Sequence, residues 1–133
     1  MSDIPIYHEG RYRLGSWFGT LEEQFRRFPL DEKFINWVAE QGFKIVYDFS
    51  WKEGAGNVWW SLRQIMVSPC GEDALVKLTL IHELIHIAIG APGNIGRKYE
   101  ELIDQIAKEY VKNLEFINYI GKKIPALTQN KGL

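Results

Sequence analysis

The residues best placed to do chemistry together are His82, Glu83 and His86, which form an HExxH segment. Residues four apart lie on one face of an α-helix, so both imidazoles can point at the same spot. That spot can hold a zinc ion at roughly 2.0–2.1 Å from each ring nitrogen. Glu83 projects beside the pair, where it can take a proton from a water on the ion without being a ligand itself. The spacing therefore predicts two zinc ligands and a general base.

A core helix with hydrogen-bonded histidines is the alternative interpretation of this segment. The chain has three histidines, and two of them flank a glutamate at this spacing, which favours the metal site. The third, His8, is interpreted as a surface histidine. A second possibility is that the segment 1–19 folds over the cleft and brings His8 or a nearby carboxylate to the zinc.

The element that must position these residues is the segment 73–90, which is apolar on almost every side. Asp73 is a candidate N-cap, and Gly90 with Pro92 can end the helix. A helix this apolar is expected at the centre of the domain. Because titratable groups at buried positions cost free energy unless they are paired or bind a metal, this burial strengthens the metal-site prediction.

A third zinc ligand must come from elsewhere, since catalytic zinc usually has three protein ligands and one open position. No histidine follows His86, but the segment after the next loop offers Glu100 and Glu101. Glu100 shares its side of a helix with apolar residues, whereas Glu101 shares its side with Lys108 and Lys112. Glu100 is therefore the better candidate.

Asp104 lies one turn after Glu100, on the same face of that helix. A metal-bound histidine commonly has its other ring nitrogen held by a carboxylate, and Asp104 could hold His82 in this way. The alternative interpretation is a solvated helix carboxylate.

The remaining pattern predicts an α+β fold in a single domain spanning 1–133, with a small mixed sheet of about three strands packed on the buried helix. Residues 1–19 and 121–133 show no convincing period, and the second of these segments is predicted to be frayed or extended. Besides the helix over 73–90, helices are expected over residues 21–28, 32–41 and 97–119. Strands are expected over residues 43–51, 58–62 and 64–68.

Composition excludes several classes of function. The formal net charge is -1, so no surface for nucleic acid or an anionic membrane is indicated. Lys77, with the three site residues, interrupts the apolar run and argues against a membrane span. The single cysteine, Cys70, is interpreted as a packing residue, and no signal peptide is evident in the first residues, so a cytoplasmic protein is expected.

The HELIH segment followed by Glu-x-x-x-Asp on a second helix resembles the gluzincin clan of zinc metallopeptidases. The short chain is most similar to the minigluzincins, and also to the ImmA/IrrE-type peptidases, over roughly residues 43–115. The resemblance implies a zincin-like domain with a long glutamate helix. It implies His82, His86 and Glu100 as zinc ligands and Glu83 as the general base. It also implies Asp104 as a carboxylate that hydrogen-bonds to one of the ligands. Tyr99, Tyr110 and Tyr119 are candidates for the family's oxyanion-stabilising group, and each has packing as its alternative.

The expected function is that of a zinc metallopeptidase, as an endopeptidase rather than an exopeptidase. The substrate would be a peptide or protein, and an extended peptide could add as a strand beside residues 64–68. Minimal gluzincins are associated with latency, so segment 1–19 or 121–133 could cover the cleft. The alternative function is a non-catalytic zinc-binding interaction module.

Overall fold

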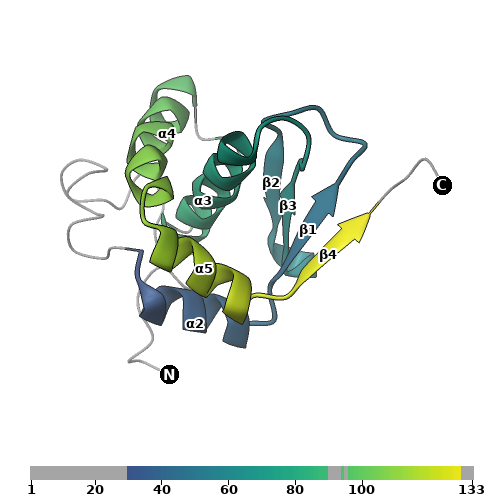
Figure 1. Ribbon diagram of the computed structural model, residues 1–133, viewed down its shortest axis with the longest axis vertical. Helices are drawn as coiled ribbons and strands as arrows, with labels where there is room; N and C mark the ends of the chain where they lie inside the picture. The colour runs from purple at the N-terminus through teal and green to yellow at the C-terminus, as the bar shows by residue number, and fades with distance from the viewer. Residues whose placement is uncertain (1–29, 90–93, 95, 130–133) are drawn as a thin grey trace.

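The computed structural model describes residues 30–89, 94 and 96–129, and these form an α+β structure (Figure 1). The expectations for segment 1–19, for His8, for the helix 21–28 and for Gly90 lie outside the described residues. The described elements, in chain order, are α2 (Glu32–Glu40), β1 (Lys44–Asp48), β2 (Gly56–Trp59), the 3-10 turn η3 (Trp60–Leu62), β3 (Gln64–Val67), α3 (Asp73–Ile89), α4 (Arg97–Val111), α5 (Leu114–Lys123) and β4 (Ala126–Gln129).

The sheet is mixed, as predicted, but it has four strands in the order β2-β3-β1-β4 rather than about three. β1 is parallel to both β3 and β4, and β2 is antiparallel to β3. Ile45 marks the register, since it lies opposite Ile65 on β3 and Ala126 on β4. The fourth strand comes from the C-terminal segment, whose residues 126–129 pair with β1 instead of fraying.

This strand order corrects one expectation about substrate binding. β3 is hydrogen-bonded on both sides, to β2 and to β1, so a peptide cannot add as a strand beside residues 64–68. Among the described strands, the edges of the sheet are β2 and β4. A peptide adding to the sheet would have to pair with one of these two.

All three predicted strands have different bounds in the structure, β3 by one residue and the other two because local turns end them earlier. The Asp48 carboxylate accepts hydrogen bonds from the Ser50 backbone N–H at 2.9 Å and hydroxyl at 2.6 Å, so β1 stops at Asp48 rather than Trp51. β2 begins at Gly56, two residues before the predicted start, and residues 60–62 form the 3-10 turn instead of continuing the strand.

Helix α3 lies between the sheet and α4, as Figure 1 shows, and contacts β2, β3 and α4. From Thr79 to Ile89 every residue except His82 is buried. The first turns, by contrast, are half-buried or exposed. The prediction of a buried helix is therefore confirmed for the part that carries the HExxH segment. Asp73 is the first helical residue, where it pairs with Lys77.

The single helix predicted over 97–119 is wrong, because the chain forms two helices there. α4 ends at Val111, and Asn113 takes an extended backbone with φ -92 and ψ 94. The Asn113 side chain accepts a hydrogen bond from the Phe116 backbone N–H at 3.1 Å and so caps the second helix. α5 then packs against α2 instead of continuing along α3 (Figure 1).

In the described part of the chain, no helix combines the length and the apolar character needed to cross a membrane.

Candidate metal centre

His82 and His86 lie one turn apart on α3, and their rings face each other. The ring centroids are 5.0 Å apart, and the two Nε2 atoms are 3.2 Å apart. His86 is 3% exposed, and His82 is half-buried at the edge of a cavity. The helix thus directs both imidazoles at one point, as the HExxH spacing predicts.

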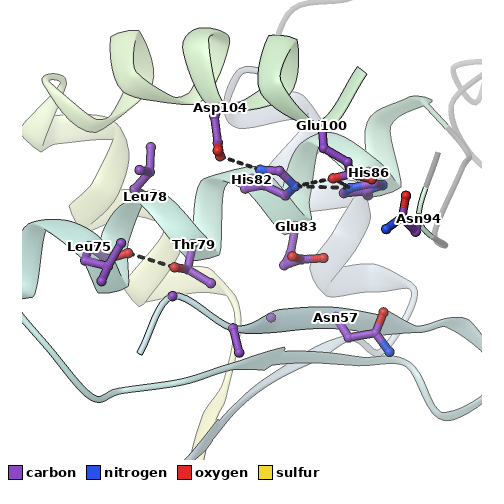
Figure 2. Close-up of a pocket in the computed structure, with 13 residues that line it drawn as sticks. Asn57, Leu75, Leu78, Thr79, His82, Glu83, His86, Asn94, Glu100 and Asp104 are labelled. Carbon is purple, nitrogen blue, oxygen red and sulfur yellow. Dashed lines mark hydrogen bonds and ion pairs between the residues drawn. The ribbon is translucent and has the colours of Figure 1, made fainter. Parts of the chain in front are cut away.

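Glu100 reaches the same point from α4. Its Oε1 lies 2.8 Å from Nε2 of His82 and 3.0 Å from Nε2 of His86. The competing candidate, Glu101, is exposed and its Oε2 lies 3.4 Å from Nε of Arg97. Ile103 and Ala107 are buried on the same helix. Figure 2 shows the Glu100 side chain directed from α4 toward the histidines of α3.

These three side chains could hold a metal ion, because one donor atom from each lies within 4.8 Å of the others. Atoms that bind one zinc ion tetrahedrally at about 2.0–2.1 Å lie roughly 3.3 Å apart. The observed separations of 2.8, 3.0 and 3.2 Å are close to that value. Two imidazole nitrogens and one carboxylate oxygen also form a common donor set for catalytic zinc, with a fourth position left open.

Asp104 holds the far side of the His82 ring. Its Oδ1 lies 2.7 Å from Nδ1 of His82, and its side chain is 50% exposed. With the proton on Nδ1, the ring donates to Asp104 and presents the Nε2 lone pair to the shared point. Asp104 therefore orients His82, which is the geometry that its position one turn after Glu100 predicts.

Charge and burial oppose each other at His82. Burial lowers the pKa of its ring, but the negative charge of Glu83 and the hydrogen bonds of Asp104 and Glu100 outweigh burial, and the pKa is raised. The centre is thus electronegative around the rings, which favours a cation there.

Glu83 projects from α3 into the space between α3 and β2, next to the two histidines (Figure 2). It is 6% exposed. Burial raises the pKa of its carboxyl, and the two imidazoles lower it only in part. A raised pKa makes the Glu83 carboxylate a stronger base than an ordinary glutamate, which suits a group that accepts a proton.

The centre opens into a cavity of about 390 Å³ between α3, α4 and the loop and strand at β2. Sequence reasoning did not single out the residues that line its other walls. They are Gly54, Ala55, Gly56, Asn57, Leu75, Leu78, Thr79 and Asn94. The signal for some of them was present in the two glycines on either side of Ala55, because glycine allows a close backbone approach.

None of the three candidate tyrosines belongs to the cavity lining. The Tyr110 hydroxyl accepts a hydrogen bond from the Leu30 backbone N–H at 3.1 Å, and the Tyr119 hydroxyl donates to Oδ1 of Asn36 at 2.6 Å. Tyr99 is partly buried and packs against the core. The structure therefore brings His82, Glu83, His86, Glu100 and Asp104 together, and the three tyrosines lie outside the cavity lining.

Fold and site together define an α+β protein with a candidate His–His–Glu metal centre and a buried glutamate beside it. Comparison with protein-family models, with curated proteins and with solved structures finds no match for this chain. The geometry of the site is therefore the basis for assigning a function.

Proposed function

We propose that the protein is a zinc-dependent metallopeptidase of the gluzincin type, with Glu83 as its general base. The observation that carries the proposal is the convergence of His82, His86 and Glu100 on one point, with buried Glu83 beside them in an open cavity. A core helix with merely hydrogen-bonded histidines would not need two further carboxylates from α4 directed at the same rings.

Each residue of the site has its own role in the proposed reaction. Zinc, when bound, supplies a Lewis acid that polarises the scissile carbonyl and makes a water more acidic. Glu83 accepts one proton from the attacking water, whose oxygen bonds to the carbonyl carbon. As the C–N bond breaks, Glu83 delivers that proton to the amine that leaves. Asp104 keeps the His82 ring in the tautomer and orientation that the site needs.

The proposed substrate is an extended peptide lying in the cavity along β2. Among the described strands, β2 pairs only with β3, so its other edge can accept main-chain hydrogen bonds. The cavity continues toward the start of α3, where Leu75 and Leu78 form an apolar wall. This end would favour an apolar side chain near the scissile bond.

The test combines zinc stoichiometry with a peptide-library assay of the full chain and of Glu83→Gln. We expect one zinc per chain in both proteins, and hydrolysis about 10²–10⁴-fold slower in Glu83→Gln because the general base is lost. Glu101→Gln removes an exposed glutamate and is the matched control, with hydrolysis unchanged.

Full hydrolysis by Glu83→Gln would contradict the role of Glu83. One zinc per chain, with no peptide cleaved by the unchanged protein or by chains that lack residues 1–19 or residues 121–133, would contradict the peptidase proposal and favour the zinc-binding module. Absence of bound zinc would contradict both the peptidase proposal and the zinc-binding module.

A further inference from the structure

Gly56 on β2 is a glycine whose missing side chain leaves room for Glu83. A Cβ at this position would lie 2.8 Å from Cγ2 of Thr79, 2.9 Å from Oε2 of Glu83 and 3.0 Å from Cγ of Glu83. Contacts under 3.0 Å, such as the first two, essentially never occur at a real Cβ, so a neighbouring group would have to move. The Glu83 carboxylate therefore lies directly on the backbone of β2.

The backbone conformation does not explain why residue 56 is a glycine. Gly56 is not among the residues with positive φ, so an L-residue could adopt its conformation. Gly54 and Gly71 do have positive φ, at 79° and 94°. At Gly121 an added Cβ would meet nothing within 4 Å. A glycine is thus needed at residue 56 because the side chains of Thr79 and Glu83 occupy the volume that a Cβ would fill.

The two neighbours differ in how easily they can yield. The Thr79 hydroxyl donates to the Leu75 carbonyl oxygen at 2.8 Å, which holds its side chain on buried helix α3. Glu83 has a longer side chain with more rotatable bonds. An added methyl group at residue 56 would therefore displace the Glu83 carboxylate before it displaced α3.

We propose that Gly56 is a positioning residue for Glu83. By bringing the bare backbone of β2 against the carboxylate, it sets where Glu83 stands relative to the rings of His82 and His86. The consequence for catalysis depends on the proposed function, but the contact itself does not.

The first experiment needs no activity. Glutamate labelled with ¹³C at the side-chain carboxyl is incorporated into the metal-free protein, and the Glu83 signal is assigned by its loss in Glu83→Gln. In Gly56→Ala we expect the Glu83 signal to move while that of exposed Glu101 stays in place. Gly121→Ala adds the same methyl group in open space and should leave both signals unchanged.

The second experiment measures hydrolysis with zinc bound. We expect Gly56→Ala to lower kcat by about tenfold to a hundredfold with KM and zinc affinity retained, since displacement of a catalytic group by about 1 Å can cost that much. In Gly56→Ala with Thr79→Ser, the contact with Cγ2 is gone and the contact with Glu83 remains, so the loss should persist. Recovery in this double variant would overturn the proposal, because Thr79 would then be the affected group.

An unmoved Glu83 signal, or unchanged kcat, in folded Gly56→Ala would also overturn the proposal. If Gly56→Ala does not fold, the signal is measured in Gly56→Ala with Thr79→Ser, where the tightest contact is relieved. Failure of that variant to fold, with Gly56→Ala plus Glu83→Ala also unfolded, would show that Gly56 serves the fold and not the carboxylate. Full hydrolysis by Glu83→Gln, by contrast, would contradict only the proposed function and leave the labelling result standing.

Discussion

Helices α4 and α5 follow one another in the chain with one continuous apolar period, but they contact different partners with different chemistry. α4 buries Ile103 and Ala107 and turns Glu100 and Asp104 toward the histidines of α3. α5 buries its own apolar face against α2 and adds one neutral hydrogen bond between Tyr119 and Asn36.

This difference between α4 and α5 suggests that one helix serves metal binding and the other serves the stability of the fold. Two carboxylates directed at two imidazoles form a group of charges that a cation can satisfy, and such a group contributes less to folding than an apolar contact of the same size. The α5–α2 contact is mostly apolar and serves folding. Variants on α4 should therefore change metal affinity, and variants on α5 should change the free energy of unfolding.

The largest effect on α4 is expected at Glu100. Glu100→Gln keeps the size of the side chain but removes the anionic ligand, so zinc affinity should fall roughly a hundredfold or more. Competition with a chelator measures the affinity. Glu101→Gln, on the exposed side of the same helix, should leave it unchanged. Equal affinity in both variants would show that Glu100 is not a ligand.

Asp104→Asn should have a smaller effect on the same quantity. The amide cannot hold the Nδ1–H of His82 as strongly as the carboxylate does, so zinc affinity should fall about 10–100-fold. Glu109→Gln changes another exposed carboxylate of α4 and is the control. If the two variants bind zinc alike, Asp104 does not orient the ring.

Asn113→Ala tests the break between the two helices. Loss of the cap on the Phe116 N–H should lower the free energy of unfolding by about 1 kcal/mol. Urea unfolding of the metal-free protein measures this, and Asn113→Asp, which can also cap, should lose much less. Zinc affinity of the folded protein should not change, and a large change would contradict the separation of α4 from α5.

Tyr119→Phe should have the smallest effect. It removes the hydroxyl that donates to Asn36, so the free energy of unfolding should fall by about 0.5–1 kcal/mol. Hydrolysis should remain at the level of the unchanged protein. A fall of more than a hundredfold in kcat would instead give Tyr119 the oxyanion role that its place outside the cavity lining does not support.

Sequence patterns could predict that His82, His86 and Glu100 lie together, because much of this geometry is local. His82 and His86 are one turn apart on a single helix, and Glu100 and Asp104 are one turn apart on another, so helical spacing alone places each pair on one face. The choice of Glu100 over Glu101 also followed from amphipathic spacing, since the apolar side of α4 had to face the core.

The break at Asn113 was missed because the apolar period crosses it without a change. Asparagine is a common N-cap residue, but an asparagine inside a periodic segment can also stay helical and exposed. What decides is that α2 lies where α5 can pack against it. The fourth strand was missed for a similar reason: residues 126–129 are short and exposed, and only the open edge of β1 gives them partners.

By itself, the amino-acid sequence determined the two halves of the candidate metal centre and the burial of the helix that carries Glu83, because helical spacing is a property of each segment alone. Only the tertiary structure decided that the halves meet with donor atoms 2.8–3.2 Å apart, and that the glycine of β2 lies against the carboxylate between them. Distances between segments depend on how the whole core packs, and no local pattern encodes them.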